Sequence, residues 1–133
     1  MGGSPLDIAT AMSQSIICDR AFELAFRVLK LCGRLWNRGP EARHIASQLM
    51  RCGTSIGANA DEAQDGHSKA DFIARLSISR KESRETLWWL RLAVKSGVVT
   101  KEEVAWELDE ARQLRVMIVS AIKTGQSSPR RHS

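Results

Sequence analysis

The chain has 133 residues, a net charge of +5 and an apolar fraction of 43%. This length is enough for one domain with its own hydrophobic core, but it is too short for the sheet and crossover helices of a hydrolase of the α/β class. No apolar run reaches the roughly 18 residues of a membrane span, and the N-terminal stretch lacks the features of a signal peptide, so we expect a cytoplasmic protein.

Four segments carry apolar residues at the spacing of amphipathic helices, and none alternates with the period of a strand. They cover residues 16–36, 41–66, 68–96 and 100–124. Short links between them favour neighbours that run in opposite directions. We therefore predict an all-α protein: an antiparallel, up-down-up-down four-helix bundle over residues 14–124, between an N-terminal extension (1–13) and a basic flexible tail (125–133).

Local signals mark where these helices begin and end. Gly39 can adopt a positive φ after the first helix, and Pro40 can open the second. Ser68 is a suitable N-cap for the third helix, which Gly97 would end, and T-K-E-E at 100–103 resembles a capping box for the fourth. We expect Gly125 to end the fourth helix.

The apolar positions of each helix predict its core face. In chain order, the predicted core residues are Ile17, Ala21, Leu24, Val28, Leu31, Cys32, Leu35; Ile45, Leu49, Cys52, Ile56, Ala60; Phe72, Leu76, Ser79, Ser83, Leu87, Leu90, Val94; and Val104, Leu108, Ala111, Leu114, Ile118, Ile122.

The stretch "GTSIG" at 53–57 matches the G-x-S-x-G pattern of serine hydrolases. In those enzymes the serine sits on a sharp turn between a strand and a helix, with a histidine and an acid supplied from later strands. Here Ser55 falls inside a helical segment. We expect Ser55 to be a small packing residue beside Gly53 and Gly57, where a neighbouring helix can approach closely, and we expect no catalytic residues.

Metal and cofactor sites are also not expected. Cys18, Cys32 and Cys52 are not at metal-binding spacing and should be reduced thiols. The polar residues Asn59, Glu62, Glu82 and Glu85 stand near predicted helix interfaces, but the chain lacks the Glu-x-x-His motif of di-iron bundles. Pairing of the acids with Arg51, Arg75 or Arg84 is the expected role.

Basic residues concentrate in the third helix. Residues 67–97 hold seven Lys or Arg against three Asp or Glu. Basic strips of this kind attract polyanions, although they can also be ordinary solvated surface. The predicted nucleic-acid-binding residues are Arg80, Lys81, Arg84, Arg91 and Lys95 on the third helix, with Arg27, Lys30 and Arg34 on the first.

Two helices carry more apolar residues than one core face can bury. The excess residues are Phe22, Phe26 and Leu29 on the first helix, and Ile78, Trp89 and Leu92 on the third. Such surfaces usually mark interfaces, so we predict a homo-oligomer. Trp88, Trp89 and Trp106 could serve the core or this interface, or they could stack on bases.

The runs "QLMRCGTSIGANADEAQ" (48–64) and "SKADFIARLSISRKESRETLWWLRL" (68–92) resemble the four helix bundle protein family. Its founding members are encoded by intervening sequences within bacterial large-subunit ribosomal RNA genes. The resemblance covers about residues 14–124. The chain departs from the family pattern at Ala60 and Asp61, where family members often carry a bulkier residue and an acid. The matched positions are Arg51, Ser55, Ile56, Asn59, Glu62, Phe72, Glu82, Glu85, Trp89 and Leu90.

The resemblance implies a ring-like homopentamer without catalytic residues. A distant relative, the accessory variability determinant of diversity-generating retroelements, is a basic pentamer that binds nucleic acid and a reverse transcriptase. By analogy, we expect a non-enzymatic oligomer that binds RNA or DNA without sequence preference, as an accessory to a reverse transcriptase or as an rRNA-associated protein. The alternative is a structural or protein-interaction module with no nucleic-acid role.

Overall fold

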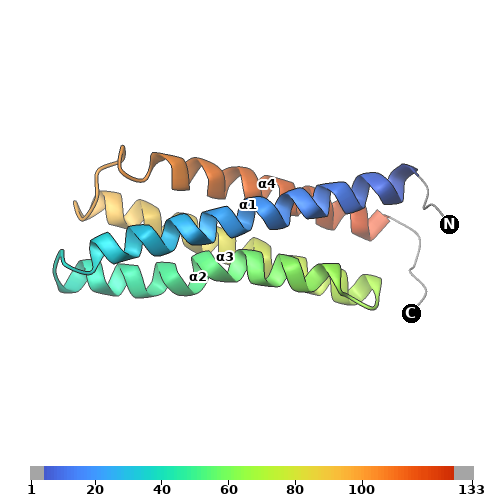
Figure 1. The fold of residues 1–133 in the computed structure, drawn as a ribbon, viewed down its shortest axis with the longest axis horizontal. Helices are drawn as coiled ribbons and strands as arrows, with labels where there is room; N and C mark the ends of the chain where they lie inside the picture. The colour runs from blue at the N-terminus through green and yellow to red at the C-terminus, as the bar shows by residue number, and fades with distance from the viewer. Residues whose placement is uncertain (1–4, 128–133) are drawn as a thin grey trace.

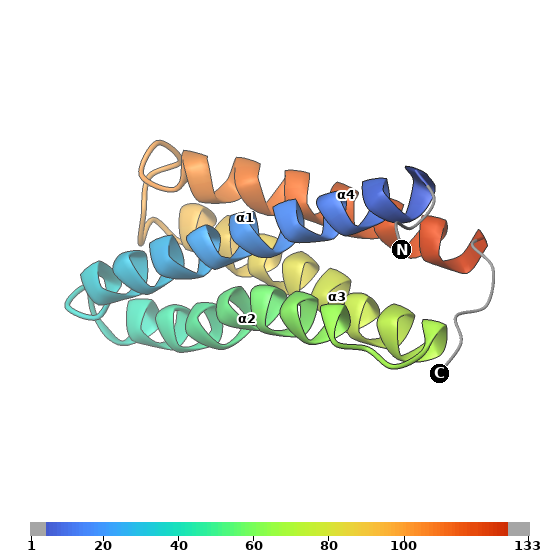
Figure 2. The ribbon, with the colours of Figure 1, turned by 45° about the vertical axis from the view of Figure 1, so that its right-hand side comes forward.

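A computed structural model describes residues 5–127 of the chain. Four helices follow one another: α1 (Pro5–Leu35), α2 (Pro40–Gln64), α3 (Lys69–Lys95) and α4 (Ala105–Ser127). No strand occurs within the described range. Each helix packs against two others, in the pairs α1–α2, α2–α3, α3–α4 and α4–α1 (Figures 1 and 2). The all-α, four-helix prediction is confirmed.

Side-chain contacts fix how neighbouring helices are aligned. In the N-terminal third of α1, Gln14 Nε2 donates to the carbonyl of Ala60 near the end of α2, at 2.9 Å. Near the other end of α1, Cys32 Sγ donates to the carbonyl of Ala46 at 3.3 Å. The start of α1 and the end of α4 lie at the same end of the bundle as the α2–α3 link (Figure 1).

The predicted signals at three helix ends are confirmed. Gly39 has a φ of 105° and Pro40 follows it in the first turn of α2, while Gly97 has a φ of 81° just after α3. The hydroxyl of Ser68 accepts a hydrogen bond from the Asp71 amide at 3.1 Å, as expected for an N-cap.

Both outer ends of the fold extend beyond the predicted helices. α1 begins at Pro5 rather than at residue 16, so most of the stretch predicted as an N-terminal extension is helical. α4 continues through Gly125 to Ser127, so the prediction that Gly125 ends this helix was wrong. A Cβ at Gly125 would lie 3.1 Å from the Phe72 ring, so the glycine allows close packing. The rest of the predicted tail, residues 128–133, is outside the described range.

The predicted core is almost entirely buried. Every predicted core residue of α1 and α2 is buried, as are those of the last helix with Val104 just before it. On α3 the buried face is rotated slightly from the predicted one. Leu87 and Val94 are only half-buried, whereas their neighbours Thr86 and Ala93 are buried.

The glycines of the G-x-S-x-G stretch let α1 and α2 approach each other closely. A Cβ at Gly57 would lie 3.3 Å from the backbone of Ala21, and one at Gly53 would lie 2.8 Å from the Val28 side chain. Ser55 lies within α2 and donates its hydroxyl to the carbonyl of Arg51 at 2.7 Å. The prediction that this stretch is a helical packing face is confirmed, since no strand-to-helix turn surrounds the serine.

Candidate nucleic-acid interface

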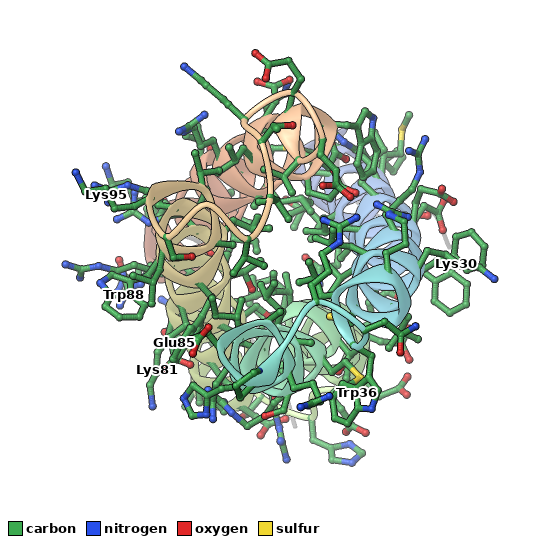
Figure 3. The ribbon with its side chains drawn as sticks, turned by 90° about the vertical axis from the view of Figure 1, so that its left-hand side faces the viewer. Lys30, Trp36, Lys81, Glu85, Trp88 and Lys95 are labelled. Carbon is green, nitrogen blue, oxygen red and sulfur yellow. The ribbon has the colours of Figure 1, made fainter. Side chains whose placement is uncertain are left out.

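The outer face of α3 presents most of the predicted basic residues. At 100° per residue, Lys81, Arg84, Arg91 and Lys95 fall within an arc of about 100° together with Trp88. All five side chains are exposed. Figure 3 shows Lys81, Trp88 and Lys95 projecting from the same side of the bundle. Arg80 is exposed at the border of this arc.

A groove runs between this face and α4. It has a volume of about 500 Å³ and is lined by Arg84, Leu87, Trp88, Arg91, Arg112 and Arg115. Two of its arginines come from α3 and two from α4. None of the four forms an ion pair with an acidic side chain within the described range. The groove therefore collects positive charge that the rest of the bundle leaves uncompensated.

Arg115 is the least solvated of these arginines. Its side chain is half-buried, and its Nε is buried with no hydrogen-bond partner in the described part of the chain. A buried donor without an acceptor typically costs about 1–3 kcal/mol.

Trp88 contacts one aromatic ring, which in turn contacts a second one. Its ring meets that of Trp89 edge to face, with centroids 4.9 Å apart and an interplanar angle of 82°. Trp89 in turn meets His44 of α2, with centroids 5.6 Å apart, and packs against the hydrophobic core. The series His44–Trp89–Trp88 thus leads from α2 to the groove, where 54% of Trp88 remains exposed.

The predicted basic strip on α1 lies elsewhere and is largely engaged. Lys30 projects on the opposite side of the bundle from Trp88 and Lys95 (Figure 3). The Arg27 guanidinium lies 4.4 Å from the centroid of the Trp106 ring and pairs with Glu23 at 3.4 Å. Arg34 pairs with Glu103 at 3.3 Å. The α1 and α3 strips therefore cannot form one continuous surface on a single chain.

Glu103, just before the start of α4, contacts two arginines at the end of α1 and just after it. It accepts a 2.7 Å hydrogen bond from Arg38 as well as the bond from Arg34, and the same Arg38 group donates to the carbonyl of Val98. The hydrogen bond from Arg38 is the main reason that the pKa of Glu103 is lowered. Arg34 and Arg38 therefore already have acceptors within the fold.

Arg51 of α2 forms ion pairs with two of the acidic residues of α3. It pairs with Glu85 at 2.7 Å and with Glu82 at 3.4 Å. Burial, together with the nearby Glu85 charge, raises the pKa of Glu82 although Arg51 acts in the other direction. Asn59 donates to the carbonyl of Ser55 in its own helix, at 2.9 Å. The predicted pairing with Arg51 is confirmed for Glu82 and Glu85. Glu62 is exposed and forms no ion pair with another described residue.

No metal or nucleophilic centre emerges from the described residues. They hold no group of three or more His, Cys, Asp or Glu placed to bind a metal ion. Burial raises the pKa of the Cys32 thiol to about 12 and that of Cys18 to about 11, so both are protonated at neutral pH. As predicted, Cys32 and Cys52 are buried in the core as free thiols.

A second apolar face runs along α1, opposite its core face. Ile8, Met12, Phe22, Phe26 and Leu29 fall within an arc of about 100°. All of them are exposed, and Phe22 reaches 79%.

The α3 residues predicted for the oligomer interface are less available than those on α1. Ile78 is exposed at 39%, whereas Trp89 and Leu92 are half-buried. Most of the unpartnered apolar surface is therefore on α1.

Arg112 and Arg115 were not predicted as part of the basic surface. These residues are one turn apart on α4, and the short connection from α3 indicated that the two helices would be neighbours. Ile8 and Met12 were also not predicted as part of the apolar face of α1, because the first helix was predicted to start after them.

Among residues 5–127, none of the helices has the length and hydropathy of a membrane span.

Comparisons with known proteins agree with the fold. A solved structure, described as a protein with unknown function from the S23 ribosomal protein family of Bacteroides thetaiotaomicron, is similar to this chain with a TM-score of 0.77 and 34% identity. The match covers 84% of this chain and 98% of the other. No curated protein matches the chain. A family model described as 23S rRNA-intervening sequence protein matches residues 13–120, and the chain therefore belongs to that family.

Proposed function

We propose that this protein is a non-enzymatic, oligomeric bundle that binds RNA or DNA through the face formed by α3 and α4. The observation that carries the proposal is the groove between these helices, whose four arginines form no ion pair with an acidic side chain among residues 5–127. Lys81 and Lys95 extend the same face beyond the groove, where they can contact further phosphates. The α1 residues Arg27 and Arg34 are secondary, because they already have partners within the fold.

Binding through this face should be largely independent of sequence. Arginine and lysine contacts to phosphates fix position without distinguishing bases. Specific reading of duplex DNA would need side chains placed to reach base edges in a groove, and the exposed face of α3 offers mainly cations and one tryptophan. A reverse transcriptase or rRNA as the biological partner rests on the family resemblance alone.

The proposed assembly is a homopentamer of antiparallel, up-down-up-down bundles. The bundle arrangement is supported by the paired contacts between helix starts and ends. Assembly is supported by the apolar face of α1, which none of the four described helices covers. The number five comes from the family resemblance. A ring would repeat the α3–α4 face in each subunit, so that weak contacts to one nucleic acid would add through multivalency.

Fluorescence anisotropy with labelled RNA and DNA oligonucleotides tests the proposal. The variant Arg112→Gln/Arg115→Gln should weaken binding at low salt by at least about tenfold, since hydrogen bonds involving charged groups contribute roughly 1.5–3 kcal/mol each. The matched control, Arg43→Gln/Lys101→Gln, removes two exposed charges elsewhere and should have a much smaller effect. Absence of binding by the parent protein at low salt would leave the structural or protein-interaction module as the better account.

A further inference from the structure

We propose that the α3–α4 groove accommodates an unstacked base together with its flanking phosphates, and hence that the protein prefers single-stranded to double-stranded nucleic acid. This inference rests on the proposed nucleic-acid binding and specifies which form of nucleic acid the groove takes. Its structural basis is the position of one exposed aromatic ring among four arginines.

The order of residues along α3 matches the chemistry of a single strand. Arg84, Trp88 and Arg91 follow each other at intervals of four and three residues, so the ring lies between two guanidinium groups on one helix face. A nucleotide strand likewise alternates charged phosphates with flat aromatic bases. Each base can stack on a tryptophan while guanidinium groups bind the phosphates on either side.

Arg112 and Arg115 close the opposite side of the groove. Together with the α3 arginines they place positive charge on both walls, and within the described range none is neutralised by an acidic side chain. Like charges confined in one groove repel each other, and a polyanion relieves this repulsion. The volume of about 500 Å³ falls in the range of small-ligand sites, so it suits a nucleotide unit.

The tryptophan is the part of the groove that a duplex cannot use. In a double helix the base faces are stacked against each other, so only phosphates and base edges are accessible. Trp88 is also pre-organised for stacking, because the edge-to-face contact with Trp89 holds its ring in position. An acidic peptide would satisfy the arginines but would leave the exposed indole without a stacking partner.

The test compares three labelled probes by fluorescence anisotropy at the same salt concentration. They are a single-stranded oligonucleotide, the duplex of the same sequence, and an abasic single strand that has phosphates but no bases. We expect the full-length protein to bind the base-containing single strand most tightly. Trp88→Leu should weaken that binding by about 5- to 150-fold, the range typical of losing one stacked base, and should leave the binding of the other two probes nearly unchanged.

Two variants serve as controls. Trp88→Phe keeps an aromatic ring and should retain most of the affinity. Trp36→Leu removes a tryptophan of similar exposure, 46% against 54%, from another side of the bundle and should have little effect (Figure 3). Because Trp88 is exposed, its variants should keep the helical content and melting temperature of the parent.

The outcomes separate this inference from the proposal on which it rests. Salt-sensitive binding that is equal for all three probes and unaffected by Trp88→Leu would overturn the inference and leave nucleic-acid binding intact. No binding of any probe at low salt would overturn both. Polyglutamate binding as tightly as the single strand, with the same dependence on Trp88, would assign the groove to an acidic protein and overturn the inference.

Discussion

The ring of Trp88 stands almost perpendicular to that of Trp89, its neighbour in the chain, with centroids 4.9 Å apart. The two tryptophans therefore have different roles although they are adjacent. Trp89 packs against the hydrophobic core and meets His44, whereas Trp88 is exposed beside the arginine-lined groove. The structure thus joins a core-packing residue to a surface residue that is available for a ligand.

This difference predicts unequal effects on stability. Trp89→Ala should lower the free energy of unfolding by about 2–4 kcal/mol, because a large packed side chain is lost. Trp88→Ala should lower it by less than about 1 kcal/mol, since more than half of the Trp88 surface is exposed. Urea unfolding followed by circular dichroism measures both values. Equal losses for the two variants would contradict the assigned roles.

The close approach of α1 and α2 predicts that substitutions at Gly57 and at Ser55 have very different effects on stability. Gly57→Leu should destabilise the fold by at least about 1–3 kcal/mol, because even a Cβ would lie 3.3 Å from the backbone of Ala21. Ser55→Ala should change stability by less than about 0.5 kcal/mol, since the serine hydroxyl bonds only to its own helix. Thermal melts of the two variants provide the comparison, and a harmless Gly57→Leu would disprove the close contact.

The ion pair between Arg51 and Glu82 predicts that the stability of an Arg51 variant depends on pH. Arg51→Gln leaves Glu82 without its cationic partner and should cost about 1–2 kcal/mol at pH 7. The pKa of Glu82 is already raised in the folded state, mainly by burial, and removal of Arg51 should raise it further. A carboxyl group whose pKa is raised by folding lowers the stability of the protein as the pH rises through that pKa. The stability difference between the parent and Arg51→Gln should therefore shrink as the pH falls toward the pKa of a free glutamic acid.

Melting temperatures of parent and Arg51→Gln between pH 7 and pH 4.5 test this sign. Glu82→Gln combined with Arg51→Gln is the matched control, because it removes the buried charge and should restore much of the stability at pH 7. A deficit that stays constant or grows at low pH would show that Glu82 is not the group responsible.

The second apolar face of α1 predicts that assembly depends on Phe22 and Phe26. Their exposures are 79% and 50%, which is unfavourable for a lone chain in water. Phe22→Glu/Phe26→Glu should reduce the molar mass measured by light scattering to that of a single chain while the helical content is retained. Ser47→Glu adds a charge to an exposed position on α2 and should leave the mass unchanged. A parent protein that is already monomeric at micromolar concentration would contradict the proposed assembly.

Much of the fold could be predicted from the sequence, because helical periodicity directly determines which residues face the core. Local chemistry also identified Gly39, Ser68 and Gly97 as residues at helix ends. Gly125 was misinterpreted because glycine serves both as a helix terminator and as a site of close packing, and only the position of Phe72 distinguishes the two uses.

The candidate site was less accessible to sequence reasoning. Periodicity brought the α3 cations onto one face, but it could not show which cations already have partners. Arg34 and Arg38 meet Glu103 only because α1 and α4 are adjacent, and the same kind of contact between α3 and α4 adds Arg112 and Arg115 to the groove. Such pairings depend on the rotation of each helix about its axis, which a single helix pattern does not define.

The salt dependence of nucleic-acid binding is the decisive measurement for the proposed role of the α3–α4 face. For a single-stranded oligonucleotide, the logarithm of the association constant should fall linearly with the logarithm of salt concentration, by about 0.7 for each phosphate that a cation neutralises. Replacing Arg84, Arg91, Arg112 and Arg115 by glutamine should make this slope shallower by about 2–3. An unchanged slope and affinity in that variant would contradict the account, because the groove between α3 and α4 would then not be the surface that binds.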